Sequence, residues 1–453
     1  MNAEPPPSIA RRLLDLALPI IGLNVLAVLT LAVDTAMCGR LPDAALALTA
    51  LGYATQFTFL LMVAMMGVTV GTVVFVSRAH GAGDGERVNH ILAQSTMLTV
   101  IVGLSVGGLG ITFATPLLAA LGASDEVTAV ALPYVVPLMG ATVFNYLNIL
   151  YAAVLRGVGN TRLPFLIALV ANAINVVINY GLILGNLGLP ALGVQGAAIG
   201  TICSWAFAVT TMIWLLRRGT IPGLFVSLRP RRLDTALVRD LFRVGAPAAL
   251  DMVILNASFL SIIGMLGRID QVAVAAHGVG LRIQALAFVP GMSISQATGA
   301  LVGQALGAGD TARARAVLRA SMGLCITSMS LLAIIIVTLA PSIVQIFDVS
   351  PASPLGLLSV EWIRLLGYGM PIVGAYIAFV GLLQGSGSTR TSLRINALTT
   401  LLFQIPLSAV LGFWLGMGAF GVWLAFPLAF VLKAIFGALA YRDGRWARVG
   451  VRA

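Results

Sequence analysis

The sequence predicts an all-α integral membrane protein with twelve transmembrane helices arranged in two pseudo-symmetric six-helix bundles. Three observations support this prediction. Apolar residues make up 59% of the 453 residues and charged residues only 9%, whereas a typical soluble domain contains about 25% charged residues. Apolar runs of about 20 residues, long enough to cross a bilayer, recur along the whole chain. The second half of the chain also repeats landmarks of the first.

Each expected span is a long apolar run bounded by polar, glycine or proline residues, and little sequence remains for a soluble domain. The twelve expected spans are residues 13–38, 46–77, 91–119, 127–155, 163–185, 193–216, 237–266, 272–304, 316–346, 359–383, 392–415 and 418–441.

The net charge of +11 is distributed as a membrane protein requires. With the N-terminus in the cytoplasm, most of the 27 lysine and arginine residues fall in inner loops and tails, which agrees with the positive-inside rule. Only Arg40, Arg268 and Arg364 fall on the outer side, and Arg282 alone lies inside a span. We therefore expect a multi-pass protein in contact with membrane lipids, with both termini cytoplasmic and no nucleic-acid partner.

The chain is predicted to be an internal duplication. A shift of 228 residues places Pro19 on Pro247 and the turn Gly157–Arg162 on the turn Gly385–Arg390. Six helices in each half is an even number, so both halves enter the membrane from the same side. The two repeats are therefore parallel, an arrangement known in some transporters.

The longest and most basic loop lies between the two repeats and predicts a linker. We expect an N-terminal six-helix lobe at residues 1–216, a basic cytoplasmic interlobe linker at residues 217–243 and a C-terminal six-helix lobe at residues 244–453.

Asp34 and Asp251 are the two carboxylates deep within expected spans, whereas the other acidic residues lie in loops, in tails or near span ends. A charged side chain in a spanning helix costs about 2.5–3.5 kcal/mol on insertion scales, and it is tolerated where it faces a partner or a water-filled cavity. From Ile20 to Cys38 the only other strongly polar side chain is Asn24. Asp34 is therefore the first candidate functional residue.

A row of asparagines predicts partners for Asp34. Asn172, Asn175 and Asn179 share one helical face, and Thr201 on the next span lies at a similar depth in the outer half of the membrane. Carboxylate, carboxamide and hydroxyl oxygens suit Na⁺, or a proton site whose charged form is stabilised by hydrogen bonds. The alternative is ordinary hydrogen bonding between helices. The shared depth favours a cation site at Asp34, Asn175, Asn179 and Thr201. The first three are the candidate ligands for Na⁺, and a proton site at Asp34 is the alternative.

The second deep carboxylate is expected to have a charged neighbour. Asp251 and Arg282 lie at similar depths on consecutive spans, and a buried charge pair is the simplest explanation for both. A structural pair is favoured, and a direct role of this C-lobe charge pair in substrate or ion handling is the alternative.

Patterns typical of enzymes are missing. The sequence contains no His-Glu-x-x-His motif, no serine nucleophile elbow and no cysteine cluster. A phosphate-binding loop needs a strand before it and a helix after it. The glycine-rich segments Gly81–Asp84 and Gly157–Gly159 lie between two expected helices, so they are predicted to be turns. We therefore expect no enzymatic activity and no cofactor other than a coupling ion.

Three sets of residues together resemble the multidrug and toxic compound extrusion (MATE) family. They are the segment Val33–Arg40, the two pairs of repeated glycine turns, and the Asn175-x-x-x-Asn179-Tyr180 motif. The resemblance covers nearly the whole chain. It implies secondary-active export of cationic or amphipathic drugs in exchange for Na⁺ or H⁺, by two lobes that open alternately. It also implies an N-lobe cation site at Asp34, Asn175, Asn179 and Thr201.

The resemblance is to the NorM-like branch and implies a monomer in a bacterial inner membrane. The chain departs from the family pattern at Asn179, where some members carry an acidic residue, and in residues 371–384, which hold no carboxylate. A flippase for lipid-linked precursors is the nearest alternative, although such a cavity would be expected to hold more positive charge. A channel is a further alternative and would need a continuous polar path.

Overall fold

The computed structural model describes residues 8–226 and 232–448, and this part of the chain is helical with no strand. The helices are α1 (Ile9–Cys38), α2 (Ala44–Gly81), α3 (Gly85–Thr112), α4 (Ala114–Ala120), α5 (Asp125–Gly140), α6 (Thr142–Gly157), α7 (Arg162–Leu184), α8 (Val194–Arg217), α9 (Thr235–Gly267), α10 (Gln271–Gly307), α11 (Thr311–Thr338), α12 (Ala340–Gln345), α13 (Pro354–Gly385), α14 (Thr389–Ala397), the π-helical η1 (Leu398–Gln404), α15 (Ile405–Ala409), the π-helical η2 (Val410–Trp414), α16 (Gly418–Asp443) and the 3₁₀ turn η3 (Arg445–Ala447).

The twelve predicted spans are confirmed, with one of them broken. Within the described residues, eleven helices are long and apolar enough to cross a membrane, the segment Thr389–Trp414 being one of them. The twelfth span is the pair α5 and α6, which are bent by 53° with respect to each other. Pro133 and Pro137 lie inside α5. Each proline removes a backbone N–H and crowds the preceding turn, which favours a bend at this place.

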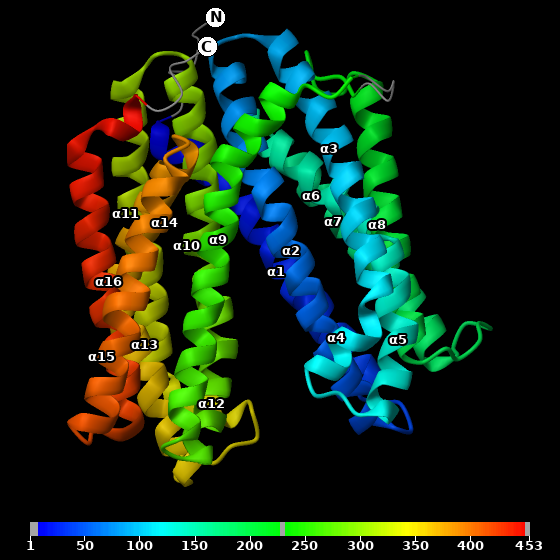
Figure 1. The fold of residues 1–453 in the computed structure, drawn as a ribbon, viewed down its shortest axis with the longest axis vertical. Coiled ribbons are helices and arrows are strands. Elements are labelled where there is room, and N and C mark those ends of the chain that lie inside the picture. Colours follow the sequence, from blue (N-terminus) through cyan, green and yellow to red (C-terminus); the bar gives the residue numbers. More distant parts are fainter. Residues whose placement is uncertain (1–7, 227–231, 449–453) are drawn as a thin grey trace, which may run out of the picture. The chain divides into compact units, whose positions relative to one another are not determined.

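The duplication extends to local structure. Helices α3 and α11 both contain 28 residues, and each begins at an aspartate that caps it. The Asp84 carboxylate accepts a hydrogen bond from the backbone N–H of Arg87 at 2.9 Å, and the Asp310 carboxylate accepts one from Arg313 at 2.8 Å. Such a cap satisfies one of the free N–H groups of a helix start. A short helix, α4 or α12, follows each of these helices (Figure 1).

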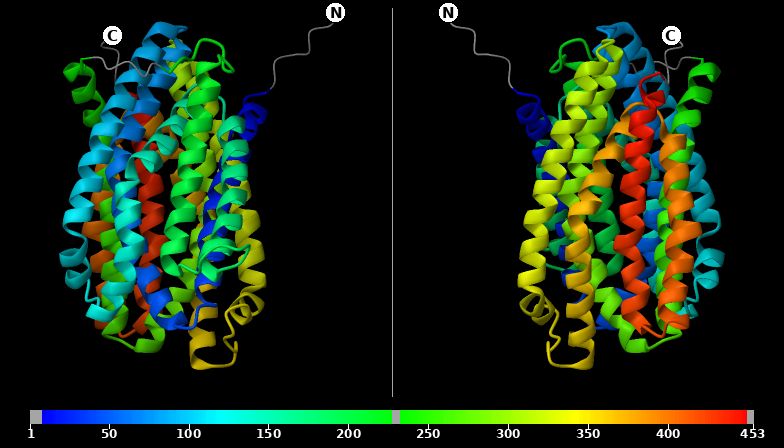
Figure 2. Two further views of the ribbon diagram at one scale, coloured as in Figure 1. Left: turned by 90° about the vertical axis from the view of Figure 1, so that its right-hand side faces the viewer. Right: turned by 90° about the vertical axis from the view of Figure 1, so that its left-hand side faces the viewer.

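The chain forms two compact units. One is Gly22–Ala246, and the other combines the chain up to Ile21 with the chain from Pro247 onward. Within each unit the long helices run alongside one another (Figures 1 and 2). The chain passes from one unit to the other inside α1, near Pro19, and inside α9, at Pro247. A proline weakens a helix locally.

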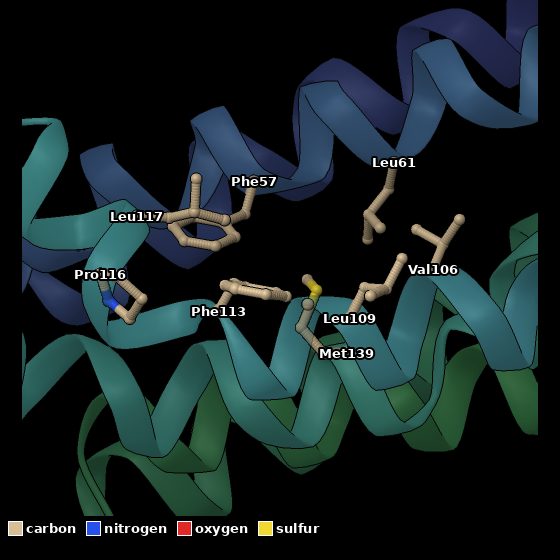
Figure 3. A pocket seen from close by; sticks show the side chains of 9 residues that line it. Phe57, Leu61, Val106, Leu109, Phe113, Pro116, Leu117 and Met139 are labelled. Atoms are coloured by element: carbon tan, nitrogen blue, oxygen red, sulfur yellow. The ribbon is translucent and has the colours of Figure 1, made fainter.

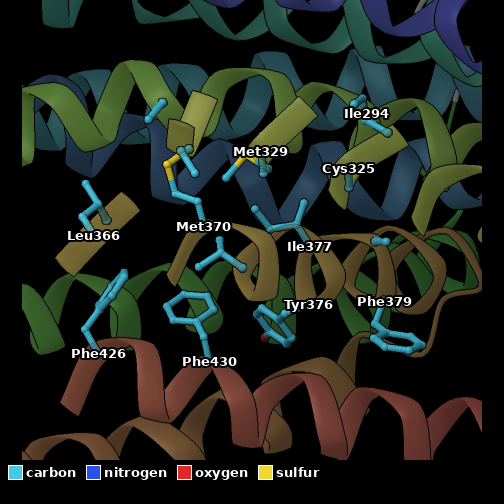
Figure 4. Close-up of a cluster of buried hydrophobic side chains, with 14 of the residues drawn as sticks. Ile294, Cys325, Met329, Leu366, Met370, Tyr376, Ile377, Phe379, Phe426 and Phe430 are labelled. Carbon is cyan, nitrogen blue, oxygen red and sulfur yellow. The ribbon is translucent and has the colours of Figure 1, made fainter. Parts of the chain in front are cut away.

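Aromatic packing fills the core of the second unit. Helix α13 packs against α10, α11 and α16, and Figure 4 shows Phe426 and Phe430 of α16 beside Met370 and Tyr376 of α13. The ring centroids of Phe426 and Phe430 lie 4.8 Å apart, and the Tyr376 ring meets Phe430 edge-on at 5.7 Å. Aromatic pairs at these distances contribute about 0.5–1.5 kcal/mol beyond the area they bury.

The first part of α9 packs on α2 with almost no space between the two backbones. A Cβ atom on Gly245 would lie 1.5 Å from the carbonyl oxygen of Gly67, and one on Gly71 would lie 2.4 Å from the carbonyl oxygen of Leu241. Small residues allow this close approach of helices, which is a common means of packing in membranes. These glycines are required by the contact between α2 and α9.

The segment that follows α8 is hydrogen-bonded to α3. The Asn89 side chain donates from Nδ2 to the carbonyl oxygen of Gly223 at 2.8 Å, and its Oδ1 accepts from the backbone N–H of Phe225 at 2.8 Å. The Asn89 carboxamide thus pairs with one N–H and one carbonyl group of an irregular backbone segment, which has no regular secondary structure to pair them.

The segment just before α9 is held five residues further along α3, at Gln94. Gln94 donates to the carbonyl oxygen of Arg232 at 3.1 Å and accepts from the backbone N–H of Asp234 at 3.0 Å. Hydrogen bonds lower the pKa of the Asp234 carboxyl: the one from the Leu237 N–H has the largest effect, and the one from the His90 side chain the next largest. The stabilisation by Asp234 is therefore complete above the unfolded-state pKa and is lost only as the pH falls through the lowered folded-state pKa.

The glycine contact predicts a selective loss of stability. Gly245→Ala should destabilise the protein by about 1–3 kcal/mol, because the new methyl group overlaps the backbone of α2. Gly264→Ala on the same helix is the control, since no described atom lies within 4 Å of the place its methyl group would occupy, and alanine should there stabilise the helix by up to about 1 kcal/mol. Thermal unfolding in detergent compares the two variants, and equal melting temperatures would contradict the prediction.

The linker contacts predict separable effects on hydrogen exchange. Asn89→Ala should speed exchange of the Phe225 amide by roughly 2- to 10-fold, the equivalent of one hydrogen bond, without changing the Asp234 amide. Gln94→Ala should do the reverse. Each variant serves as the control for the other in hydrogen-exchange mass spectrometry, and a common change at both amides would show that the linker opens as one piece.

Candidate functional site

Asp34 lies near the end of α1 and is buried. Its side chain is 5% exposed, and its Oδ1 accepts a hydrogen bond from Asn179 Nδ2 at 2.7 Å. Asn179 lies on α7, so this bond joins the carboxylate-bearing helix to a partner helix within the first unit. Hydrogen bonds to charged groups are among the stronger ones, at about 1.5–3 kcal/mol.

The asparagine face of α7 points toward α1 as expected. Asn175 and Asn179 are both fully buried, and Asn179 Nδ2 also donates to Asn175 Oδ1 at 3.2 Å. One turn further from Asp34, Asn172 accepts a hydrogen bond from the hydroxyl of Thr30 on α1. The structure thus brings Asp34, Asn175 and Asn179 together, while Asn172 serves to join the two helices.

Two polar atoms at this cluster remain without a partner. Asn179 Oδ1 and Asn175 Nδ2 are buried, and neither has a hydrogen-bond partner among the described residues. A buried polar atom left unpaired costs about 1–3 kcal/mol, so such atoms commonly mark a place for a ligand or for water. The free oxygen of Asn179 and the Asp34 carboxylate are both hard oxygen ligands, which suit a small monovalent cation.

Gly200 of α8 provides the space for this oxygen. A Cβ atom at Gly200 would lie only 1.9 Å from Asn179 Oδ1, so no larger residue fits without moving the carboxamide. Sequence reasoning instead selects its neighbour Thr201. In the described part of the chain, no hydrogen bond joins the Thr201 hydroxyl to Asp34, Asn175 or Asn179, and the Thr201 carbonyl oxygen accepts a bond from the Ser204 hydroxyl.

The surroundings of Asp34 are otherwise apolar or weakly polar. The charge of Asp34 acts on Tyr134 of α5 and on Cys38 at the end of α1, and both of these side chains are buried. The field of a buried charge extends further in an apolar interior than in water. A cation or proton that binds at Asp34 would therefore change the electrostatics of three helices.

The expected pair between Asp251 and Arg282 is not formed. Asp251 Oδ1 accepts a hydrogen bond from Asn396 Nδ2 at 2.6 Å, and its Oδ2 lies 3.4 Å from the Ser392 hydroxyl. Arg282 is exposed, and its guanidinium lies 6.0 Å from the ring centroid of Phe347. No ion pair joins the two residues in the portion described. Depth along each helix predicted the pair, but each of the two side chains has other partners.

Asn396 of α14 was missed by sequence reasoning, although a signal was present. The Asp34–Asn179 and Asp251–Asn396 bonds both span 145 residues of sequence. In each case a second polar residue lies four residues away, and Thr400 donates to Asn396 Oδ1 at 3.2 Å in the second unit. At the repeat offset of 228, Asn172 corresponds to Thr400. Thr400 lies four residues beyond Asn396, the asparagine that binds the carboxylate.

An apolar cavity of about 440 Å³ lies apart from the polar cluster in the first unit. Figure 3 shows its lining of Phe57, Leu61, Leu109, Phe113 and Met139, contributed by α2, α3 and α5 and the turn after α3. The residues that line it carry no charged side chain. This cavity suits an apolar group and cannot hold a coupling ion, because nothing in it would replace the ion's water.

These features define a class of protein. A duplicated bundle of spanning helices, with a buried carboxylate beside unpaired carboxamide atoms inside one unit, has the organisation of a membrane transporter. The MatE family matches residues 19–181 and again residues 247–410, and the two matches begin at Pro19 and Pro247, the residues that the duplication pairs.

Known proteins agree with this class. A probable multidrug resistance protein NorM of Thermotoga maritima is 26% identical over 99% of this chain and 95% of its own length. A FAD transporter of Shewanella oneidensis is 29% identical over 94% of this chain and 93% of its own length. An outward-facing multidrug resistance MATE family transporter of the MOP superfamily has the same fold, with a TM-score of 0.89 at 21% identity, covering 98% of this chain and 97% of that one. The chain belongs to the MATE family, in its NorM-like branch.

The site geometry predicts different roles for two neighbouring polar residues. Asn179→Ala should destabilise the protein by about 1–3 kcal/mol, because it removes the donor to a buried carboxylate. Thr201→Val should change stability by less than about 0.5 kcal/mol, because its hydroxyl makes no bond to the cluster. Unfolding of the purified variants in detergent gives both values. A loss of stability in Thr201→Val equal to that in Asn179→Ala would show that the Thr201 hydroxyl interacts with the cluster.

Proposed function

We propose that this protein exports small molecules across the membrane in exchange for Na⁺ or H⁺, and that Asp34 binds the coupling ion together with Asn179 and Asn175. The observation that carries the proposal is the unpaired oxygen of Asn179 beside the buried Asp34 carboxylate. Thr201 stays a candidate ligand by its depth alone.

The chemistry of this cluster fits a single monovalent cation. An ionised Asp34 receives one hydrogen bond, from Asn179, and its remaining charge is uncompensated among the described residues of the first unit. Na⁺ would neutralise it and accept the free Asn179 oxygen as a further ligand, whereas H⁺ would neutralise it directly. Either ion drives a conformational change only through a difference in affinity between the two states. Pro19 lies inside α1 close to the point where the chain passes from one unit to the other, and this local weakness of the helix offers a route for such coupling.

Small molecules of cationic or amphipathic character are the proposed cargo. Relatives over nearly the whole chain are named multidrug resistance proteins, which supports efflux of drug-like compounds. The apolar cavity lined by Phe57 and Phe113 would suit the lipophilic part of such a molecule. Because one relative is named a FAD transporter, an anionic dinucleotide belongs in any test of cargo.

The proposed orientation places both termini in the cytoplasm of a bacterium, with the chain in the inner membrane. The distribution of arginines between the two sides supports it. The two repeats would act as the alternating lobes, with residues 217–243 as the cytoplasmic linker between them. A monomer is the proposed functional form.

The test is transport in proteoliposomes with opposed Na⁺ or H⁺ gradients. Asp34→Asn should abolish gradient-driven uptake of a lipophilic cation, at least 10-fold below the unsubstituted protein, while the protein remains folded. Asp43→Asn is the matched control, because Asp43 is exposed at the start of α2 and its side chain makes no capping bond. Transport that persists in Asp34→Asn would remove Asp34 from the mechanism.

Three further arms of the same assay separate the alternatives. Labelled FAD tests an anionic cargo, and a labelled lipid-linked precursor tests the flippase. Flux of ions without any cargo exchange would indicate a channel and would contradict the exchanger. Uptake of the cation only under a Na⁺ or H⁺ gradient is the result that the proposal expects.

A further inference from the structure

The second unit buries the only lysine of the chain. Lys433 of α16 is 1% exposed, and its Nζ lies 4.8 Å from the ring centroid of Phe430 and 5.8 Å from that of Tyr376. Figure 4 shows these two rings between α13 and α16. Because the face of an aromatic ring attracts an ammonium group, these two rings favour the charged form of the lysine.

The lysine and the carboxylate of this unit act on each other. Helix α14, whose Ser392 and Asn396 bind Asp251, packs against α16, which carries Lys433, so the opposite charges of Asp251 and Lys433 act on each other. Among the described residues they form no direct ion pair, and the hydrogen-bond partners of Asp251 are Asn396 and Ser392. Tyr376 interacts with both groups, because its ring lies near Lys433 Nζ and the charge of Asp251 acts on it. A single uncompensated charge in this interior would cost several kcal/mol, so each group stabilises the charged form of the other.

The carboxylate of the first unit lacks such a cation. Among the described side chains, Asn179 is the group that stabilises the Asp34 charge, and no basic residue acts on it. Near its end the repeat aligns at an offset of 225, which places Gly193 on Gly418 and Gly196 on Gly421. The residue that corresponds to Lys433 is Ala208 at this offset and Trp205 at the offset of 228. The two units therefore share a carboxylate bonded to a carboxamide but differ in the source of positive charge.

We propose that Lys433 is a tethered counter-cation, which takes at Asp251 the place that Na⁺ or H⁺ takes at Asp34. This inference rests on the proposed ion site at Asp34 and extends it to the number of ions exchanged. Asp251 binds no coupling ion while the ammonium is present, so each turnover exchanges the ion of the first unit alone. Removal of the ammonium creates a second monovalent-cation site from the oxygens of Asp251, Asn396 and Ser392.

The charge state of Lys433 can be observed directly. Because it is the only lysine, protein labelled with ¹⁵N-lysine gives a single Nζ signal in NMR without any assignment. We expect the signal of an ammonium group at neutral pH in the unsubstituted protein and that of a neutral amine in Asp251→Asn. A neutral amine in the unsubstituted protein, or an ammonium signal that Asp251→Asn leaves unchanged, would overturn the proposal.

The number of bound ions tests the consequence. Lys433→Met should bind one more ion per chain than the unsubstituted protein, counted as radiolabelled Na⁺ plus protons taken up at constant pH. The extra ion should disappear when Asp251→Asn is added, and Lys433→Arg, which keeps the charge, should not acquire it. An unchanged count in Lys433→Met would overturn the proposal.

The same measurement in an Asp34→Asn background separates this inference from the proposed function. Loss of an ion in Asp34→Asn reports on the first unit, whereas the gain produced by Lys433→Met reports on the second and is expected in either background. If Lys433→Met does not fold, the NMR comparison of the unsubstituted protein with Asp251→Asn still decides the question.

Discussion

A carboxylate inside an apolar helix bundle must find hydrogen-bond donors in the protein, because the hydrocarbon of a bilayer supplies none. Each unit meets this requirement with one carboxamide, at 2.7 Å between Asp34 and Asn179 and at 2.6 Å between Asp251 and Asn396. The first bond joins α1 to α7, and the second joins α9 to α14. The same requirement explains why the free oxygen of Asn179 beside Asp34 and the buried lysine of the second unit are chemically important.

The two carboxylate pairs share a helical face but not a depth. The second pair lies 217 residues after the first, eleven residues short of the repeat offset of 228. Eleven residues are about three turns, so the side chain keeps its direction while its depth changes by about 16 Å. Asp34 accordingly lies four residues from the end of α1, whereas Asp251 lies near the middle of α9. A duplicated scaffold can in this way hold two chemically different sites against equivalent partner helices.

Much of the fold was predictable because the bilayer imposes the length and composition of each span. The twelve spans and the repeat both followed from apolar runs and from turn residues such as Gly157–Arg162. The bend between α5 and α6 and the passage of the chain between units near Pro19 and Pro247 were not predicted, since a proline marks a weak point in a helix without specifying the angle. The π-helical turns η1 and η2 also have no simple sequence signal.

The sequence by itself determined the membrane fold, its duplication and the helices that carry Asp34, Asn175, Asn179 and Asp251, because these follow from hydrophobicity and from helical period. Only the tertiary structure decided the partners. It bonded Asp251 to Asn396 instead of pairing it with Arg282, and it placed Gly200 rather than Thr201 against the Asn179 oxygen. Position along a helix can be read from residue number, but the rotation of each helix about its axis is decided by how all the neighbouring side chains pack.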